Sequence, residues 1–483
     1  MSRYLIKPFL LLSLLFITFD VLHATTVTVG TGKMYATPNA LHLANVLNDG
    51  DTILIDPQTF TGNTSLAAWS RNNLVIVGVG TQKTKLVANG SYILGKGIWV
   101  FIGNNITVEN IEFSGATVPD ENGAGIRLDG SGMTVRRCYF HDNENGILTS
   151  NPGTGDILIE HTEFDNNGFG DGQTHNLYIG RINKLTFRYN YSHHAKIGHN
   201  LKTRAKENYI EYNRIMDEDT GTSSYLIDMS NGGVAVLKGN LLMQGINTDN
   251  CNLISFGSEG FPAGYQRVLY VINNTFVNRR SPGCNFLNIS AQATSVSVYN
   301  NVFAGLGSIA GSFPATIGGN LVETNISNVG LANEAGFDYA LLSNSPAINI
   351  GVSVPAVAGL DFSIDKSYVH PYNFSSRISN GLIDAGAYEY QSVLAINDED
   401  EQTELFENPT KLLCFPNPTE GMIQISYEKQ QVEYLKIINA MGQVLVENTN
   451  TNSIDLSKFP KGTYYLYVKP VKRDPKVITI VRI

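Results

Sequence analysis

The chain has 483 residues, of which 42% are hydrophobic and 16% are charged, and its formal net charge is −9. This is enough apolar material for a large core, while the charged fraction lies well below the roughly 25% of a typical globular domain. A net negative charge argues against a nucleic-acid-binding protein. Low charge combined with 46 glycines and 10% aromatic residues favours an extracellular all-β protein over a cytosolic helical enzyme.

Residues 1–24 have the features of a secretory signal peptide. Arg3 and Lys7 give a basic start, an apolar run follows from Phe9 to Phe19, and Ala24 is a small residue before the expected cleavage site. The basic flank distinguishes this segment from a buried first strand or helix. No later segment reaches the roughly 18 consecutive apolar residues of a membrane span. The sequence therefore predicts an exported protein without a transmembrane segment in its mature chain.

The next elements indicate the start of a solenoid. Residues 40–56 predict a helix followed by a strand, with Asp49-Gly50-Asp51 as the turn between them. A solenoid needs its first coil covered, and this helix is the expected cap. Residues 73–80 predict a buried strand, and residues 107–113 predict a further coil.

Residues 134–305 contain a degenerate repeat that starts with a short strand. Successive units are marked by a small or polar residue with an apolar residue two positions later, and their steps range from 23 to 34 residues. Irregular steps around a period in the mid-twenties indicate a solenoid with loops of variable length. The recurring Asn predicts a stacked amide ladder with a structural role. The marking positions are Cys138, Thr162, Asn190, Asn213, Asn240, Asn274 and Asn301.

A second strand of each unit predicts which side chains face inward. Aligning these strands places Leu177, Leu201, Leu226 and Leu253 in one inward column. Because side chains alternate across a strand, Tyr178, Lys202 and Arg204 are then expected to point outward.

Four stretches carry a resemblance to a known fold family: "DGDTILI" at 49–55, "NNLVIVGVG" at 72–80, "ITVENIEF" at 106–113 and the closing "SPAINIG…IDAGAYE" at 345–389. They resemble secreted bacterial proteins of the pectate-lyase-like right-handed β-helix superfamily over roughly residues 26–392. The resemblance implies an all-β chain whose residues 25–392 form a single-stranded right-handed parallel β-helix. Residues 345–390 would be its final coil and closing segment. The fold hosts lyases, hydrolases, epimerases and adhesins, so it leaves the reaction open.

The end of the chain differs in composition from the repeat. Residues 393–411 include Asp398 to Glu401, Glu404 and Glu407 and predict an acidic linker. Residues 412–483 contain several short alternating strands, which predict a small β-sandwich of plausible domain size.

The motifs of this tail closely resemble the C-terminal sorting domain of the type IX secretion system. They are Pro416-Asn-Pro418, Gly421, Met441-Gly442, residues 454–457 and Pro460 to Tyr464. The resemblance implies Sec export followed by type IX secretion, with the secretion machinery as a partner and a secreted or cell-surface location. A carbohydrate-binding sandwich is the weaker alternative, because both tryptophans, Trp69 and Trp99, lie in the solenoid.

The four cysteines leave two alternatives open. Cys251 and Cys284 occupy similar places in successive repeats, and an exported protein permits disulfides. Sequence spacing cannot distinguish a bridge between coils from two buried thiols. There is no CxxC pair and therefore no cysteine spacing typical of a zinc site.

The segment from Gly172 to Lys206 contains no Asp or Glu. An acidic chain that gathers cations on adjacent coils is expected to present a basic patch, and such a patch favours an acidic ligand. Export and a long solenoid surface make a uronate-containing, acidic polysaccharide the expected partner. The basic residues are Arg181, Lys184, Arg188, Lys196, Lys202, Arg204 and Lys206, together with His175, His193, His194 and His199.

Cleavage beside a uronic acid can proceed by β-elimination, in which the proton α to the carboxylate is removed. Lyases of this fold typically use Lys or Arg as the base. Lys202 is the favoured base, because crowded cations would favour its neutral form. Arg204 would neutralise the carboxylate, Tyr178 would protonate the leaving oxygen, and His199 would shuttle protons. The contiguous catalytic motifs of pectate lyases are absent, so no catalytic residue is transferred from them.

Further residues at the adjoining turns and strands are candidates for binding sugar, although His175 and His193 could equally hold neighbouring backbone. The substrate-binding candidates are His175, Asn176, His194, Lys196, Asn200 and Tyr225. Carboxylates that flank the basic segment are weak candidates for Ca²⁺ ligands, and are equally typical of turns. These metal candidates are Asp165, Asp171, Asp217 and Asp228.

Three functions remain in competition. The favoured one is an extracellular polysaccharide lyase, which would make the chain an enzyme. A glycoside hydrolase of the same fold needs two or three close carboxylates on one outward face, which Asp217, Asp219 and Asp228 would have to supply. A non-enzymatic surface or adhesive β-helix predicts no concentrated charged cleft.

Overall fold

The computed structural model describes residues 24–379 and 381–391 and, toward the C-terminus, 413–415, 419, 421–426, 432–439, 444–448, 453–470 and 476–482. It divides into two compact units, Met1–Val393 and Leu394–Ile483. The acidic linker predicted at 393–411 lies outside the described residues, as does the signal peptide apart from Ala24.

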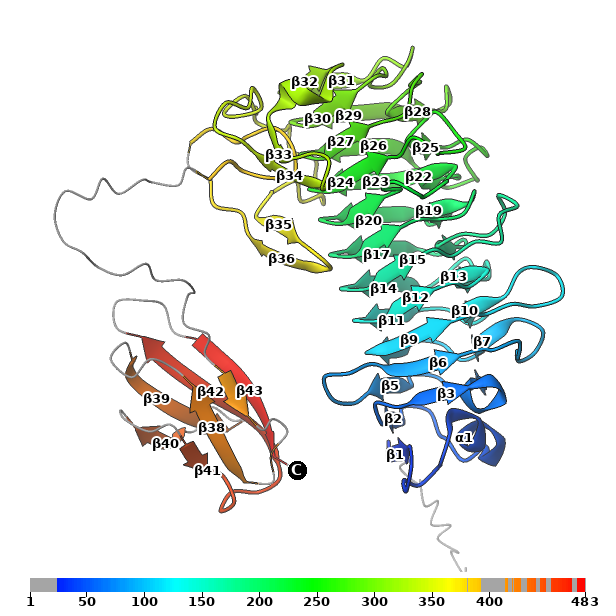
Figure 1. Ribbon diagram of the computed structural model, residues 1–483, viewed down its shortest axis with the longest axis vertical. Coiled ribbons are helices and arrows are strands. Elements are labelled where there is room, and N and C mark those ends of the chain that lie inside the picture. Colours follow the sequence, from blue (N-terminus) through cyan, green and yellow to red (C-terminus); the bar gives the residue numbers. More distant parts are fainter. Residues whose placement is uncertain are drawn as a thin grey trace, which may run out of the picture. The chain divides into compact units, whose positions relative to one another are not determined.

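The first unit is a parallel β-helix whose coils build three long parallel sheets, here named A, B and C in the order the chain visits them (Figure 1). Among the described residues, sheet A has twelve strands, sheet B eleven and sheet C nine.

Sheet A consists, in chain order, of β1 (Thr26–Val29), β2 (Thr52–Ile55), β5 (Val75–Gly78), β8 (Ile106–Glu109), β11 (Met133–Arg136), β14 (Asp156–Glu160), β17 (Lys184–Arg188), β20 (Glu207–Glu211), β23 (Gly233–Lys238), β26 (Arg267–Ile272), β29 (Ser295–Tyr299) and β31 (Thr316–Gly318). Sheet B consists of β3 (Thr59–Thr61), β6 (Thr84–Val87), β9 (Ile111–Ser114), β12 (Tyr139–His141), β15 (Glu163–Asp165), β18 (Tyr191–His193), β21 (Arg214–Met216), β24 (Leu241–Gln244), β27 (Thr275–Asn278), β30 (Val302–Gly305) and β32 (Leu321–Glu323). Sheet C consists of β4 (Ala67–Trp69), β7 (Gly97–Phe101), β10 (Ala124–Leu128), β13 (Asn145–Thr149), β16 (Leu177–Ile179), β19 (His199–Thr203), β22 (Tyr225–Met229), β25 (Ile254–Phe256) and β28 (Leu287–Ile289).

The core follows from the alternation of side chains along each strand. Inward residues of successive coils stack directly on one another, and the clearest stack is aromatic. The ring centroids of Phe113 and Phe140 lie 4.9 Å apart and those of Phe140 and Phe164 lie 5.1 Å apart, with all three side chains fully buried. Stacked inward rings of this kind contribute both buried apolar area and specific ring contacts.

The first coil is covered by a short helix, as the sequence predicted. Helix α1 (Pro38–Ala44) begins after Thr37, whose side chain accepts a hydrogen bond from the Ala40 N–H, and it buries Leu41. Proline at the first helical position and an N-cap threonine are both typical of a helix start. A 3₁₀ turn, η1 (Gly62–Ser65), packs against this helix.

The predicted asparagine ladder is confirmed. The side-chain oxygen of Asn213 accepts from both the backbone N–H (2.9 Å) and the side-chain amide (3.1 Å) of Asn190 on the previous coil. Asn240, Asn274 and Asn301 repeat this arrangement on the following coils, fully buried. The ladder satisfies backbone groups at the turn between sheets A and B, which explains why the same residue type recurs there.

The predicted inward column of sheet C has the wrong register beyond β19, by one residue. Leu201 is paired with Ile227, not with Leu226, and Ile227 is paired with Ile254. Leu226 and Leu253 are fully buried in the core as predicted, but they lie one position away from the column of Leu201. Asp228 therefore stands outward beside Lys202.

The predicted final coil at 345–390 is also wrong. The coils end with β32, and residues 326–379 and 381–390, here named the covering segment, pack against the outer face of sheet B (Figure 1). This segment contains η2 (Ile326–Val329), β33 (Leu331–Asn333), β34 (Asp338–Leu341), β35 (Lys366–Val369) and β36 (Asn373–Ser376). Tyr339, Leu341 and Tyr368 pack there with the outward Met243 and Val277. The outer face of sheet B is apolar at these coils and is buried by a second layer rather than by another coil.

The described residues of the second unit form two antiparallel sheets. One contains β37 (Leu413–Phe415), β38 (Met422–Ser426) and β41 (Ser453–Asp455), and the other contains β40 (Val444–Asn448), β39 (Val432–Asn439), β42 (Gly462–Pro470) and β43 (Lys476–Arg482). Ile423 and Ile454 of the first sheet share a buried cluster with Leu435 and Leu466 of the second. The predicted small β-sandwich is thus confirmed. The motif residues 416–418 and 441–442 lie outside the described residues.

The disulfide alternative is resolved, because Cys251 and Cys284 are bridged and link successive coils. Cys138 is a buried free thiol, and burial raises its pKa to about 11. Within the part of the chain that the structure describes, no helix is long and apolar enough to cross a membrane.

Candidate functional site

The basic residues predicted to form one patch are distributed over all three sheets. Lys184 and Arg188 lie on sheet A, His193 lies on sheet B, and Lys202 lies on sheet C. The cations of sheet A are already paired, since Arg188 contacts Glu160 at 2.7 Å and Lys184 contacts Asp156 at 3.3 Å. The prediction of a single basic patch is wrong because one coil passes through all three faces, so neighbours in sequence face different directions.

Five side chains from four successive coils do converge on the outer face of sheet C, and they are named the sheet C cluster: Tyr178, Lys202, Arg204, Asp228 and Glu259. The register of β16, β19 and β22 places Tyr178, Lys202 and Asp228 side by side. The Lys202 ammonium lies 3.0 Å from Glu259 and 3.3 Å from Asp228. The Arg204 guanidinium lies 2.6 Å from Glu259 and donates through Nε to the Tyr178 hydroxyl at 2.5 Å.

The electrostatics of this cluster differ from the prediction. The charged groups in contact with Lys202 are two carboxylates, Asp228 and Glu259, rather than other cations. Partial burial raises the pKa of Glu259, but hydrogen bonds and charge from Lys202 and Arg204 outweigh burial and hold this pKa below its ordinary value. Burial lowers the pKa of Arg204, and hydrogen bonds to Glu259 and Tyr178 reverse that effect and raise it.

Two buried histidines line the base of the cluster. His175 Nδ1 accepts from the His199 backbone N–H at 3.1 Å, and His199 Nδ1 accepts from the Tyr225 N–H at 3.3 Å. The remaining ring nitrogen of His199 therefore carries the proton in the neutral imidazole and faces Asp228 at 3.5 Å. Burial lowers the pKa of His199 to about 4 and that of His175 well below its usual range. Both rings are neutral near pH 7 and orient their neighbours.

The predicted substrate-binding residues lie in different structural environments. Tyr225 is half-buried against the His199 ring and adjoins the cluster. Asn176 and Asn200 are fully buried in a second amide ladder, where the Asn176 amide donates to Asn200 at 2.9 Å. The prediction that these two bind substrate is therefore wrong, because their amides satisfy groups at the turn between sheets B and C. Lys196 lies in that turn, and His194 lies beside sheet B.

Sequence reasoning missed the part played by two acids in this cluster. Glu259 lies in the loop after β25, 57 residues from Lys202, where no repeat position marks it. Asp228 was considered only as a metal or hydrolase candidate, because the misaligned column hid its place beside Lys202. Its Oδ1 is buried without a hydrogen-bond partner, while Oδ2 accepts from Ser230 at 2.6 Å.

A cleft of about 340 Å³ adjoins the cluster on sheet C. Arg127, Leu148 and Tyr178 form its floor from three successive coils, and Asp120, Asp171 and neighbouring loop residues form its walls. Tyr178 belongs to both the cleft and the cluster, so a chain-like ligand lying along the cleft would reach Lys202 and Arg204.

The four carboxylates considered for Ca²⁺ do not come together. Asp171 accepts hydrogen bonds from Gln173 and Thr174 within its own turn. Asp217 is fully buried, and burial raises its pKa to about 6. Asp228 belongs to the sheet C cluster. These positions do not form an oxygen-rich Ca²⁺ cage, so no step of a mechanism is assigned to that ion.

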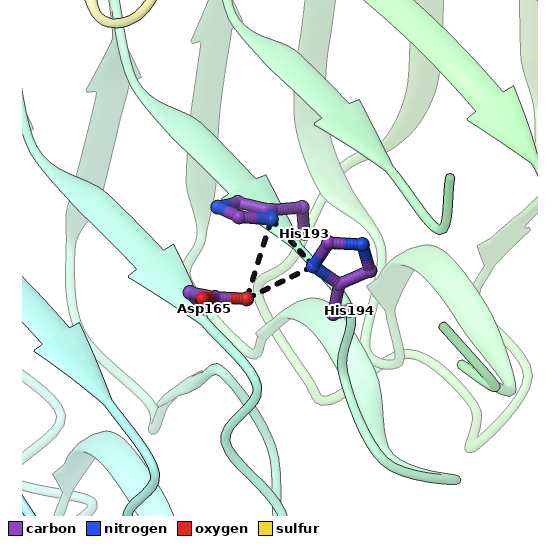
Figure 2. Close-up of side chains that lie close together, drawn as sticks. All are labelled: Asp165, His193 and His194. Carbon is purple, nitrogen blue, oxygen red and sulfur yellow. Dashed lines mark hydrogen bonds and ion pairs between the residues drawn. The ribbon is translucent and has the colours of Figure 1, made fainter. Parts of the chain in front are cut away.

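Asp165 belongs to a different group, in which it meets His193 and His194 on sheet B. Figure 2 shows the three side chains pointing toward one another. One potential ligand atom from each lies within 4.8 Å of the others, and this is the group of potential metal ligands found among the described residues.

Comparison with known proteins agrees with this architecture. Residues 42–176 match the family model of the right handed beta helix region, and residues 413–481 match that of the secretion system C-terminal sorting domain. Among solved structures, the crystal structure of pectate lyase Pel9A matches with a TM-score of 0.50 and 13% identity, over 76% of this chain and 97% of that chain. This likeness shows the fold alone. No curated protein matches the chain.

Proposed function

This chain is a secreted right-handed β-helix protein with a type IX sorting domain, and from this premise we propose that it is an extracellular lyase acting on a uronate-containing polysaccharide. One observation carries the proposal. Lys202 and Arg204 together hold the carboxylate of Glu259 on the outer face of sheet C, beside a cleft of about 340 Å³ that Tyr178 also lines.

The geometry around Glu259 is that of a carboxylate-binding pair. Each of its two oxygens contacts a different cation, Oε1 the Lys202 ammonium and Oε2 the Arg204 guanidinium. Charge-assisted contacts of this kind are strong and oriented. Glu259 itself lies on a loop, and its side chain is 43% exposed. A uronate carboxylate that displaced Glu259 would meet the Arg204 guanidinium and the Lys202 nitrogen without rearrangement of sheet C.

The same pair suits β-elimination. With the uronate carboxylate neutralised by Arg204, Lys202 in its neutral form would take the proton from the carbon α to that carboxylate. The electrons of the broken C–H bond form a carbon–carbon double bond, and the C–O bond at the β carbon breaks. Asp228, 3.3 Å from the Lys202 nitrogen, holds the Lys202 side chain in place, and the proton that Lys202 must first lose passes to solvent. His199 acts as a positioning residue through its contact with Asp228.

Tyr178 is the proposed acid that protonates the leaving oxygen. Its hydroxyl oxygen accepts a hydrogen bond from Arg204 Nε, which leaves its own O–H available as a donor. Tyr178 also lines the cleft, so this donor lies between the cations and the bound polymer.

A glycoside hydrolase is the second candidate, because Asp228 and Glu259 both lie within 3.3 Å of the same ammonium. A hydrolase needs one carboxylic acid with a raised pKa as the proton donor. The pKa of Glu259 is instead lowered by its cations, which disfavours this mechanism. A purely adhesive β-helix would not need a charged cluster beside a cleft.

The test is incubation of the mature protein with alginate, pectate and glycosaminoglycans while the absorbance of unsaturated uronate ends is followed. Lys202→Met is expected to abolish any such signal, and Lys206→Met removes a cation from the same coil as the matched control. Reducing ends released without unsaturated products would establish the hydrolase instead. Absence of any cleavage with all of these acidic glycans would refute the lyase.

A further inference from the structure

The group on sheet B lies on a different face from the sheet C cluster and takes no part in the proposed reaction. Asp165 ends β15, and His193 ends β18 directly opposite it in the parallel register. His194 is the next residue along the chain. Three side chains from two adjacent coils thus share one small region of surface (Figure 2).

Two consecutive residues on a strand normally point to opposite faces. His194 does not follow this alternation, because its φ of 50° lies in the left-handed region. This conformation turns the chain directly after the strand. Asp142 and Asn166 occupy the corresponding turns of the two preceding coils with φ of 54° and 55°. This conformation is several-fold enriched in Asn, Asp and His. The recurring turn of the solenoid is therefore what brings His194 back toward His193.

The atoms that meet are all electron-pair donors. His194 Nδ1 lies 2.7 Å from His193 Nδ1 and 2.9 Å from Asp165 Oδ1, and His193 Nδ1 lies 3.3 Å from the same oxygen. Atoms this close need a proton or a metal ion between them, since each offers a lone pair when it carries no hydrogen. An ion bonded to nitrogen and carboxylate oxygen at about 2.0–2.2 Å would cap this triangle just outside its plane. The three ligands would then occupy one face of the ion and leave the opposite positions open.

The surroundings supply an independent indication of a metal. Histidine ligands in metal sites characteristically donate their second ring N–H to a carboxylate, which fixes the ring. His193 Nε2 lies 3.3 Å from Glu163, and His194 Nε2 lies 3.5 Å from Glu218. Both rings therefore turn Nδ1 toward the shared point and Nε2 toward an acid.

The acids around the rings are themselves held in place. Glu218 accepts from the Tyr191 hydroxyl and from Arg214 at 3.2 Å. The second oxygen of Asp165 accepts from the Tyr139 hydroxyl at 3.4 Å. A supported outer layer of this kind pre-organises a metal site, whereas a fortuitous contact between two histidines would not need it.

We propose that Asp165, His193 and His194 form a binding site for a first-row divalent metal ion such as Zn²⁺. Two imidazole nitrogens and one carboxylate oxygen suit these ions, whereas Ca²⁺ takes oxygen ligands almost exclusively. The side chains of His194 and Asp165 are 25% and 26% exposed, so an ion can reach them. Three protein ligands with open positions are typical of sites that also bind water or a substrate oxygen, whereas structural zinc sites have four protein ligands.

The test uses the full mature chain without an added histidine tag, treated with chelator and then titrated with Zn²⁺ alone. Calorimetry and elemental analysis are expected to show one bound ion per chain. His194→Gln and Asp165→Asn should each weaken Zn²⁺ binding at least tenfold. His42→Gln, which removes one histidine from the capping helix α1, should leave binding unchanged.

A spectroscopic measurement on the unaltered protein tests the site even if the variants fail to fold. Co²⁺ in place of Zn²⁺ is expected to give visible absorption bands that change when acetate is added, because an open position accepts a new oxygen ligand. Lack of stoichiometric binding, binding equally weakened by His42→Gln, or equal preference for Ca²⁺ would each refute the metal site. Protons alone would then hold the three groups together.

Discussion

Sheets B and C present their outward side chains in the same repeating geometry, but the two columns have different chemistry. On sheet B the column through Asp165 and His193 continues, in register, with Met216, Met243 and Val277. On sheet C the column through Tyr178 and Lys202 continues with Asp228 and Ser255. One column changes from titratable to apolar within a single coil, and the other remains polar.

The difference shows how one solenoid can use one face for packing and another for binding a ligand. The apolar part of sheet B is buried under the covering segment, so only its N-terminal part can meet a ligand. The sheet C cluster lies beside a cleft and balances two cations against two carboxylates. Solenoid geometry sets where side chains stand, and the residue at each position decides whether the face packs or binds.

The largest expected effect is on the rate of polysaccharide cleavage, which should depend on sheet C and not on sheet B. Lys202→Met should lower the rate of polysaccharide cleavage by about 10²–10⁴, because it removes the proposed base. His194→Gln on sheet B should leave that rate within a factor of about three. Initial rates of unsaturated-end formation measure both variants. Equal losses in the two would show that the faces act together.

The next effect concerns the stability of the covering segment, which buries the apolar part of sheet B. Arg377 is almost fully buried and contacts Glu389 at 2.8 Å. Arg377→Ala leaves that carboxylate buried and unpaired, which is expected to destabilise the covering segment by about 3–5 kcal/mol. Hydrogen exchange should then accelerate in β33 to β36 while sheet C keeps its protection. Lys366→Ala, which removes a more exposed pair with Asp365, is the control and should change exchange little.

The third effect is a pH dependence that belongs to sheet C. The pKa of His199 is about 4 in the folded state and near 6.5 when unfolded. Between these values the unfolded chain binds a proton that the folded chain does not, so stability falls as pH falls through this window. The contribution is about 3 kcal/mol in full.

His199→Asn keeps an acceptor for the Tyr225 N–H and removes the titration. Chemical denaturation at pH 7 and pH 4.5 should therefore show a smaller loss of unfolding free energy for this variant than for the natural protein. His42→Gln should show the natural loss. Identical pH profiles for all three would contradict the assignment to His199.

The smallest effect concerns the asparagine ladder at the turn that leads into sheet B. Asn240→Ala removes the oxygen that accepts from the backbone and side chain of Asn213, and each buried group left unpaired costs about 1–3 kcal/mol. The Asn213 amide keeps its hydrogen bond to the Phe187 carbonyl at 2.8 Å, so only the backbone N–H loses its partner, and denaturant unfolding should report a loss in that range. Asn247→Ala, at an exposed turn, should stay within about 0.5 kcal/mol.

The sequence by itself determined the solenoid, its cap, its asparagine ladder and the sandwich of the tail. These features depend on contacts that repeat with the period of the coil, so each residue type recurs where its physical role recurs. The outward direction of Tyr178, Lys202 and Arg204 followed from the alternation of side chains along one strand.

Only the tertiary structure decided which charges meet. The loop lengths between coils fix the register, and this register places Asp228 directly beside Lys202. Glu259 reaches Lys202 from a loop outside the repeat. His194 joins His193 through a left-handed turn that inverts the expected alternation. Contacts of this kind are not periodic, because they depend on where loops and turns bring single side chains, and no local pattern in the sequence carries that information.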